Sequence, residues 1–327
     1  MLLRITNARG VNLDVFDFDY DLTWTAFFLN GHEKIYGRYG GRDAGSADAY
    51  LTLPGLKYAM RAALASYRRD PGSKPELESR TPRTVEQFPA AKALKADACI
   101  HCHQVYDFRR AERKAAGTWR LDDVWVYPQP ANLGIVLDPD QGNRVKAVQK
   151  GTAAERAGLQ AGDELTTVDR QPVASFADVQ YALERAPAKG AIRVAWRRAG
   201  AERAADLELA NGWRKTDIGW RASMWGLEPS PCVYGVNLTA AEKKALGLLE
   251  RGMAFRQGEY VPGPAKRVGI RANDVIFDID GKQLEMTMLQ FNAYVRLNYK
   301  VGDRITFNVL RDGKRLDVPM VLPRGDN

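Results

Sequence analysis

Residues 154–169 read AERAGLQAGDELTTVD, and residues 265–280 read AKRVGIRANDVIFDID; these two similar stretches decide the fold. A glycine, an aspartate and a second aspartate keep one spacing between the copies, because 269−158, 274−163 and 280−169 all equal 111. A repeat of this length indicates a duplicated domain rather than an array of short units.

The two copies predict the same order of secondary structure. In each, a short helix ends at a glycine, Gly158 or Gly269, where a left-handed backbone favours a residue without a Cβ atom. The elements expected next are a strand (residues 164–168 and 275–279), a helix after a turn (residues 176–186 and 288–299), and a hairpin turned at Ala199-Gly200 or Asp312-Gly313.

The repeated string resembles the PDZ domains of bacterial HtrA-type proteins. The resemblance implies two PDZ-like β-sandwich or barrel domains, in which an extended peptide is added as a strand beside an exposed sheet edge. The expected partners are therefore peptide or protein C-termini. The family's carboxylate-binding loop corresponds to Leu133, Gly134, Ile135 and Val136 in the first copy. In the second copy the nearest match is Tyr234, Gly235 and Val236, followed by an insertion at residues 239–250.

The N-terminal region predicts strands, a hairpin and a helix in that order. Residues 1–30 have strand character, residues 35–39 return as the second arm of a hairpin, and Pro54 begins a helix. One buried helix face is expected from the spacing of Leu56, Ala59, Met60, Ala63 and Leu64. With the string TWTAFFLNGHEKIYGRYGG at residues 23–41, this order resembles the distal half of a thioredoxin fold. That family's Cys-x-x-Cys helix and cis-proline are missing, so the resemblance implies a partial thioredoxin-like unit without its redox chemistry.

The sharpest chemical signal is the string CIHCH at residues 99–103. Cys-x-x-Cys-His is the attachment motif of c-type haem, in which Cys99 and Cys102 would form thioethers and His103 would ligate the iron. We therefore expect one covalent haem c (heme c). A structural zinc site is an alternative, but its remaining thiol or imidazole ligands would have to be His32 and Cys232. A thiol redox pair is another; it expects the cysteines directly after a strand, whereas a helical pattern at residues 84–98 precedes them.

Composition limits the classes of partner. The 327 residues carry 48 Lys and Arg against 40 Asp and Glu, a net charge of +8, which favours acidic partners or a membrane surface. The basic residues 108–120 are interpreted as a solvated helix face, and no nucleic-acid-binding motif accompanies them. No window approaches the roughly 18 apolar residues of a membrane-spanning helix, so the chain is not expected to be an integral membrane protein.

Haem attachment of this kind takes place outside the cytoplasm, so a periplasmic or otherwise extracytoplasmic location is expected. Residues 1–7, MLLRITN, do not resemble a signal peptide. We therefore expect the recorded chain to be incomplete at its N-terminus.

No protease signature is recognised in the sequence. Histidine occurs at positions 32, 101 and 103, no Gly-x-Ser-x-Gly turn is found, and Tyr36 stands where a zinc-protease helix needs its second histidine. We therefore predict a non-enzymatic, extracytoplasmic monohaem electron-transfer or redox-sensing protein, docked to partners by tandem PDZ domains and serving an unknown redox partner. The alternative is a non-enzymatic PDZ peptide-binding scaffold with a structural zinc or thiol site.

The expected architecture is α+β and multidomain. It comprises a partial thioredoxin-like α/β unit at residues 1–68, a linker and a short helical haem segment at residues 69–127, and PDZ-like domains at residues 128–211 and 212–325.

Overall fold

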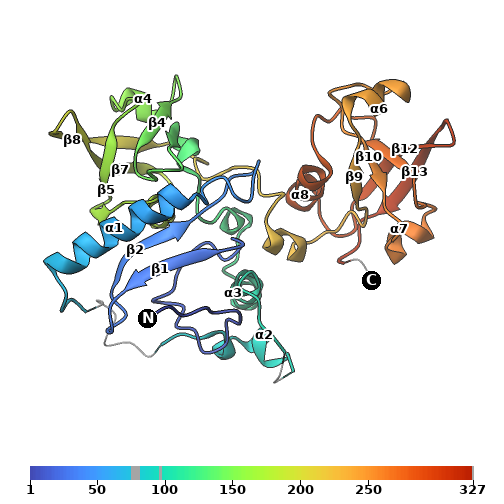
Figure 1. Ribbon diagram of the computed structural model, residues 1–327. Helices are drawn as coiled ribbons and strands as arrows, with labels where there is room; N and C mark the ends of the chain where they lie inside the picture. The colour runs from blue at the N-terminus through green and yellow to red at the C-terminus, as the bar shows by residue number, and fades with distance from the viewer. Residues whose placement is uncertain (75–81, 96–97, 326–327) are drawn as a thin grey trace. The chain divides into compact units, whose positions relative to one another are not determined.

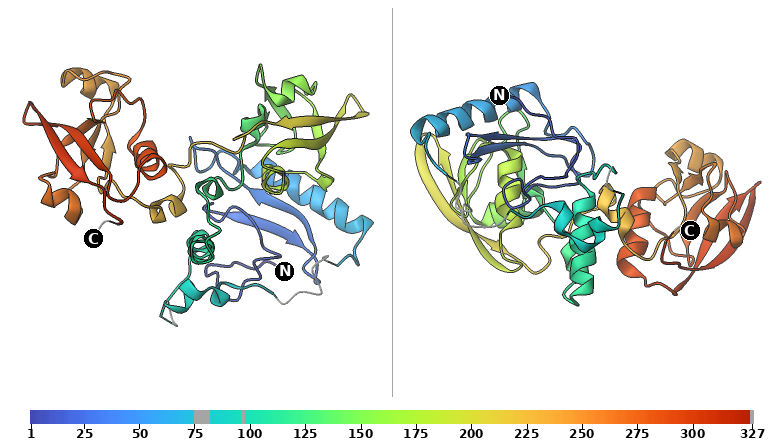
Figure 2. Two further views of the ribbon diagram at one scale, coloured as in Figure 1. Left: turned by 180° about the vertical axis from the view of Figure 1, so that it is seen from behind. Right: turned by 90° about the horizontal axis from the view of Figure 1, so that it is seen from below.

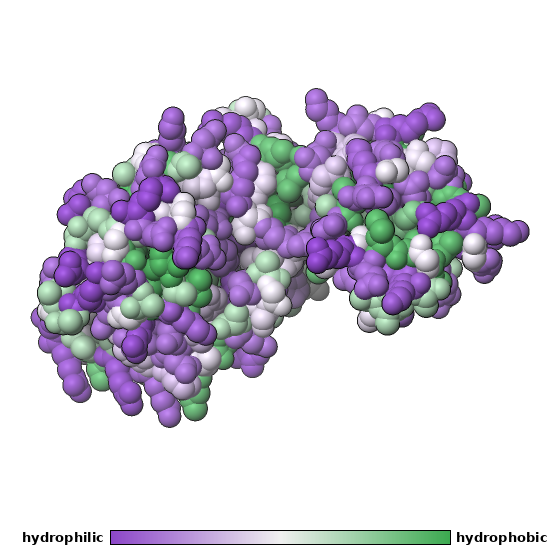
Figure 3. Space-filling model, turned by 90° about the horizontal axis from the view of Figure 1, so that it is seen from above, coloured by the Kyte–Doolittle hydropathy of each residue, from purple (hydrophilic) through white to green (hydrophobic). Residues whose placement is uncertain are grey.

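The computed structural model describes residues 1–74, 82–95 and 98–325 (Figure 1). The chain forms two compact units, Met1–Thr216 and Asp217–Asn327. Each unit contains one copy of the repeat and has a hydrophobic core of its own. On the face drawn in Figure 3, hydrophilic side chains predominate and hydrophobic ones form separate patches between them.

The N-terminal unit begins with a hairpin and a helix, as predicted. Strand β1 (Thr25–Leu29) pairs antiparallel with β2 (Ile35–Gly40), and α1 (Leu53–Arg69) lies against β2 (Figures 1 and 2). Thr52 caps α1 by accepting the Gly55 N–H, and Pro54 occupies its first turn, where a missing N–H costs nothing.

Two expectations for this region are wrong. Helix α1 does not bury Met60 and Leu64; its buried face consists of Gly55, Ala59 and Ala63. The hairpin comes so close that a Cβ atom on Gly37 would lie 3.4 Å from the Ala63 Cβ, so only small residues fit between α1 and β2. In addition, residues 2–5 form no strand, and their apolar side chains are exposed.

Residues 82–127 contribute to a small core rather than forming only a connection. Phe88, Ile100, Val105 and Phe108 pack with Leu13 from the start of the chain. The elements here are η1 (Val85–Gln87), α2 (Pro89–Lys92), α3 (Gln104–Ala115) and η2 (Leu121–Val124). Two short helices thus replace the single one expected at residues 84–98, of which residues 96 and 97 lie outside the described residues. In α3, Arg113 and Lys114 are exposed, as expected of residues 108–120. Arg109 and Arg110 are instead half-buried, because they lie against the carboxylates of Asp17 and Asp107.

The first repeated domain completes the N-terminal unit. Its elements are η3 (Pro130–Leu133), β3 (Ile135–Leu137), β4 (Val145–Val148), α4 (Ala153–Arg156), β5 (Glu164–Val168), β6 (Gln171–Pro172), α5 (Phe176–Glu184), β7 (Gly190–Arg198) and β8 (Ala201–Leu209). Strands β3 and β4 pair with each other, and a second sheet has the order β6-β5-β7-β8. Leu165, Val194 and Leu207 lie at the centre of the core.

The second repeated domain lies in the C-terminal unit. Its elements are η4 (Ala222–Gly226), β9 (Gly235–Asn237), α6 (Ala240–Ala245), β10 (Phe255–Gln257), α7 (Gly263–Arg267), β11 (Val275–Ile279), α8 (Met288–Asn298), β12 (Arg304–Arg311) and β13 (Lys314–Val321). The sheet order is β13-β12-β11-β10-β9, and Phe255, Phe291 and Phe307 form the centre of its core.

The repeat predicted these elements closely. Strands β5 and β11 occupy the expected residues, and helices α5 and α8 begin at the expected ones. Gly158 and Gly269 have φ angles of +84° and +98°, so both helix ends need the left-handed backbone that glycine allows.

Candidate functional site

Each repeated domain presents a strand with an unpaired edge. Strand β3 pairs with β4 on one side, with Ile135 opposite Val148, and β9 ends the five-stranded sheet, with Gly235 opposite Gln257. Within residues 1–74, 82–95 and 98–325, no strand pairs with the second edge of β3 or β9. Such an edge offers backbone N–H and C=O groups to an added peptide strand.

The loop before β3 depends on glycine. Gly134 has a φ angle of +87°, its N–H donates to the Ala131 carbonyl (2.9 Å), and its carbonyl accepts the Gln149 N–H (2.9 Å). A Cβ atom at this position would overlap the side chain of Thr152. On either side, Leu133 and Ile135 are buried in the core, so the predicted carboxylate loop is held rigidly at the start of β3.

The corresponding loop before β9 is built differently. A Cβ atom on Gly235 would overlap the Arg256 carbonyl of β10, so glycine is needed here for close approach of the two strands. The Tyr234 N–H donates to the side-chain oxygen of Gln257 (3.1 Å). Val236 is 75% exposed at the sheet edge. The inserted residues that follow form α6, whose first turn is closed by reciprocal bonds between Thr239 and Glu242.

Helix α8 is bonded to the last residue of β9 and to the segment just before the strand. The Met288 N–H at its first turn donates to Asn237 Oδ1 (2.7 Å), and Asn292 Nδ2 donates to the Val233 carbonyl (3.2 Å). These bonds fix the helix beside the strand. A peptide added to β9 would therefore meet a preformed wall.

Helix α5, the equivalent helix of the first domain, is covered by the N-terminal hairpin region. The ring of Tyr50 stacks on Phe176 with centroids 3.7 Å apart, and the Arg38 guanidinium lies 3.4 Å from the centroid of Tyr181. The Arg38 N–H also donates to Asp178 (3.0 Å). Burial raises the pKa of Asp178, and the neighbouring Arg38 cation only partly offsets this. No pattern in the sequence predicts the contact between the hairpin region and α5, because the residues that it joins are more than 120 positions apart.

A buried ion pair explains the first repeated aspartate. Asp163 accepts two bonds from Arg198, at 2.6 and 2.7 Å, and one from the Gln160 N–H at 2.8 Å. The same arginine donates to the carbonyl of the repeated Gly158 (2.7 Å). In the second domain Asp274, Arg311 and Gly269 repeat this arrangement. In each domain, one arginine of the last hairpin therefore bonds both the repeated glycine and the repeated aspartate. We call this arrangement of three residues the aspartate–arginine clamp.

The cysteine string precedes α3 and carries two free thiols. Cys99 is exposed, Cys102 is half-buried, and burial raises the pKa of the Cys102 thiol. His103 occupies the N-cap position of α3, and its ring centroid lies 6.0 Å from that of His101. Among the described residues, no group of three or more His, Cys, Asp or Glu side chains is placed to hold a metal ion. The zinc alternative therefore gains no support from the structure.

Two family models, both described as PDZ domain, match residues 144–198 and 261–322. This chain contains two PDZ domains. Each match includes the repeated strand, the helix that follows it and the first strand of the closing hairpin, β7 or β12. The PDZ part of the HtrA-type resemblance is thus confirmed.

The curated relatives come from one group of proteins. The chain is 29% identical over 183 residues to a probable periplasmic serine endoprotease, DegP-like, of Hahella chejuensis, covering 54% of this chain and 37% of the relative. It is 28% identical over 183 residues to a protein of the same description from Pseudomonas putida, with the same coverage. The chain spans well under half the length of these relatives. Among solved structures, it is similar to the HtrA-type protease AlgW with a decapeptide, with 25% identity, coverage of 30% of each chain and a TM-score of 0.24.

These relatives correct the predicted chemistry. They are described as probable serine endoproteases, so the prediction of a haem c protein for electron transfer or redox sensing is wrong. The roles predicted for Cys99, Cys102 and His103 are not tested by this similarity. The five-residue string was too short a signal, since it specifies two thiols and an imidazole but none of the surrounding haem pocket. The similarities also give the redox partner and the thioredoxin-like interpretation of residues 1–68 no support.

The prediction of a non-enzymatic protein, which the scaffold alternative shares, is contradicted as well, because the relatives are named serine endoproteases. The prediction rested on catalytic motifs that are missing from this chain, and the chain aligns with only 37% to 44% of each relative. The periplasmic or extracytoplasmic location is confirmed, since all four relatives are periplasmic. No helix among the described residues is both long enough and apolar enough to cross a bilayer.

Proposed function

We propose that this chain recognises the C-termini of polypeptides through its PDZ domains, and that this recognition serves serine endoproteolysis of the DegP type. The first site consists of Leu133, Gly134, Ile135 and Val136, and the second of Tyr234, Gly235 and Val236. The observation that carries the proposal is the unpaired edge of β3, which directly follows a loop whose turn is made by the left-handed Gly134.

The peptide would bind as an additional antiparallel strand on this edge. Backbone hydrogen bonds supply affinity that does not depend on sequence, and the loop at Gly134 lies where the terminal carboxylate would end. Because Leu133 and Ile135 are packed into the core, the loop is already ordered before binding, which lowers the entropic cost of association.

The DegP-like part of the proposal rests on the relatives. PDZ domains that hold a polypeptide by its end leave its preceding residues extended, which is the conformation a protease needs. Proteolysis by the whole protein is therefore the activity that this recognition would serve.

The binding test uses a fluorescent peptide ending in an apolar residue, and fluorescence anisotropy measures its dissociation constant. We expect Gly134→Ala to weaken binding at least about tenfold, because its Cβ displaces Thr152 and the loop with it. Gly117→Ala is the matched control, since Gly117 also has a positive φ (+66°) but has no atom within 4 Å of an added Cβ. Amidation of the peptide C-terminus should weaken binding to the wild-type protein. Equal binding of the amidated peptide would show that the carboxylate is not recognised.

The proteolytic part is tested separately. The chain is incubated with unfolded casein, with and without a serine-directed fluorophosphonate inhibitor. Cleavage that the inhibitor blocks supports the proposal. Absence of cleavage at saturating casein would contradict the proteolytic part while leaving the peptide-binding result unaffected.

A further inference from the structure

Helix α1 has two apolar faces, and only one of them is covered. Its narrow buried face consists of Gly55, Ala59 and Ala63. The larger apolar side chains lie on the exposed side: Leu53, Met60, Leu64 and Tyr67, with exposed fractions from 40% to 62%. Their separations of seven, four and three residues bring them onto one side of the helix. At 1.5 Å per residue, this stripe is about 21 Å long.

A row of cations runs beside the apolar stripe. Lys57, Arg61 and Arg68 follow each other at spacings of four and seven residues, so they share a face next to Met60 and Leu64. All three are exposed, and none forms an ion pair within the part of the chain that the structure describes. Residues 53–69 contain no Asp or Glu, so no carboxylate of the helix itself balances this charge.

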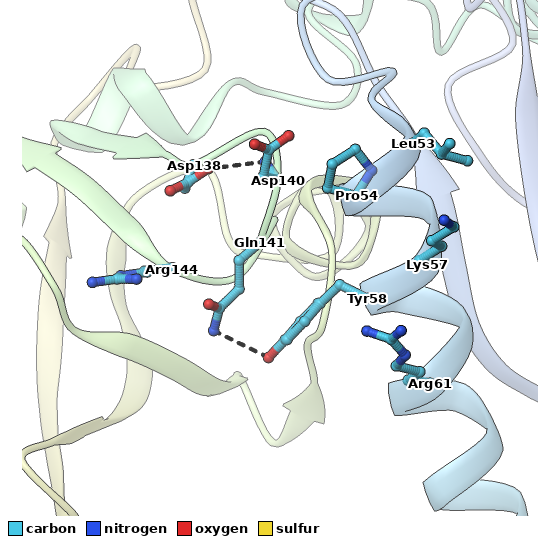
Figure 4. A pocket seen from close by; sticks show the side chains of 9 residues that line it. All are labelled: Leu53, Pro54, Lys57, Tyr58, Arg61, Asp138, Asp140, Gln141 and Arg144. Carbon is cyan, nitrogen blue, oxygen red and sulfur yellow. Dashed lines mark hydrogen bonds between the residues drawn. The ribbon is translucent and has the colours of Figure 1, made fainter.

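Two of these cations, Lys57 and Arg61, border an open cleft of about 440 Å³. Figure 4 shows Lys57, Tyr58 and Arg61 on the wall formed by α1, and Gln141 and Arg144 on the wall formed by the loop between β3 and β4. A hydrogen bond from Gln141 to the Tyr58 hydroxyl (3.2 Å) joins the two walls. Two carboxylates, Asp138 and Asp140, lie on the same loop, and the first accepts the N–H of the second (2.9 Å). Cations are thus accessible both along the helix and at the rim of the cleft.

We propose that the exposed face of α1 binds the surface of a membrane containing anionic phospholipids. Leu53, Met60 and Leu64 would enter the boundary between headgroups and acyl chains, and Lys57, Arg61 and Arg68 would contact headgroup phosphates. Charge complementarity identifies the occupant, because the cations of α1 lie beside its apolar stripe, and together with Arg144 they outnumber the two carboxylates of the facing loop, Asp138 and Asp140. A periplasmic chain has membrane surfaces within reach, and α1 would lie along such a surface rather than cross it.

The test is co-sedimentation of the whole chain with vesicles of phosphatidylcholine containing phosphatidylglycerol, compared with vesicles of phosphatidylcholine alone. We expect binding to the anionic vesicles, and we expect it to weaken as salt is added. Each cation near an anionic surface changes the partition constant about fivefold (about 1 kcal/mol), so Lys57→Gln with Arg61→Gln should reduce it roughly 25-fold. Met60→Ser with Leu64→Ser should reduce it at least about tenfold.

The control variant carries Lys189→Gln and Arg203→Gln, which remove the same charge from exposed positions outside α1. It should bind anionic vesicles as the wild type does. Because all substituted residues are exposed, thermal unfolding of each variant should match the wild type. The proposal is overturned if neutral vesicles bind equally well, or if the control loses as much binding as the α1 variants. It is also overturned if polyglutamate binds the chain in an Arg61-dependent way while anionic vesicles do not, because the partner would then be an acidic protein.

Discussion

The duplicated aspartate–arginine clamp allows a prediction whose size follows from the structure. Asp163 is 1% exposed and accepts two hydrogen bonds from Arg198 and one from the Gln160 N–H. Asp163→Asn keeps the shape of the side chain but removes the charge and turns one acceptor into a donor that faces the guanidinium. At least two charge-assisted bonds are lost, at about 1.5 kcal/mol each, so we expect a loss of about 3 kcal/mol in the free energy of unfolding.

Thermal unfolding followed by tryptophan fluorescence measures this loss. For a unit of this size, about 3 kcal/mol corresponds to a decrease in Tm of about 6 to 12 °C. Trp196 is buried on β7, directly opposite Leu165 of β5, so it reports on unfolding of the first PDZ domain. The equivalent substitution Asp274→Asn should lower the other transition instead, which assigns each transition to its unit.

The control is Glu202→Gln, which removes a partner of Arg197 on the exposed surface of the same hairpin. Exposed ion pairs contribute little, so this variant should unfold as the wild type does. The reasoning is refuted if Asp163→Asn shifts the transition no further than Glu202→Gln, since the clamp would then add nothing beyond a surface pair.

Three further predictions concern the N-terminal unit. Tyr50→Ala should lower the free energy of unfolding of this unit by about 2 kcal/mol, because it removes a ring stacked on Phe176; urea unfolding measures the loss, and an unchanged midpoint would contradict the contact. Burial raises the pKa of Asp178, so the native state binds a proton at this carboxylate more tightly than the unfolded chain does. As the pH falls through the raised pKa, Asp178 becomes protonated and destabilises the native state less. The stability of Asp178→Asn relative to wild type should therefore decrease as the pH falls from neutral toward the ordinary pKa of an aspartate, about 4, and a constant difference would exclude the shift. Among the three thiols, Cys99 should react first with Ellman's reagent, Cys102 more slowly, and buried Cys232 only after unfolding, as mass spectrometry of the labelled peptides would show.

The repeat made the PDZ part of the fold predictable from sequence. Gly158 and Gly269 each mark a helix end, and Asp163 and Asp274 each precede a strand. The spacing between the glycine and the aspartate is therefore the same in both copies. The partners of these residues were not predictable. Arg198 and Arg311 lie in hairpins with several other arginines, and nothing in the local pattern distinguishes the one that closes the clamp.

Helix α1 shows why periodicity alone misassigned a face. Its sequence offers apolar residues on more than one side, and spacing cannot tell which side the fold will bury. The hairpin determines which face of α1 is buried. Because β2 approaches the helix closely at Gly37, Ala63 fits between them and a side chain as large as Leu64 does not. Burial therefore followed from the size of the side chains rather than from their hydrophobicity, and the larger ones remained available for a partner.

The haem prediction made from the cysteine string was wrong for a related reason. Motif spacing describes a chemistry that a few residues can perform, whereas a cofactor site also requires a cavity and ligands from elsewhere in the fold. The PDZ edges differ from it in this respect. Gly134 is constrained by Thr152 and by two backbone hydrogen bonds, and Gly235 by the carbonyl of Arg256, so the surrounding structure itself requires the residues that the motif named. A motif whose residues are also demanded by their neighbours is the stronger basis for a functional proposal, and here that criterion favours peptide recognition over any chemistry at Cys99 and Cys102.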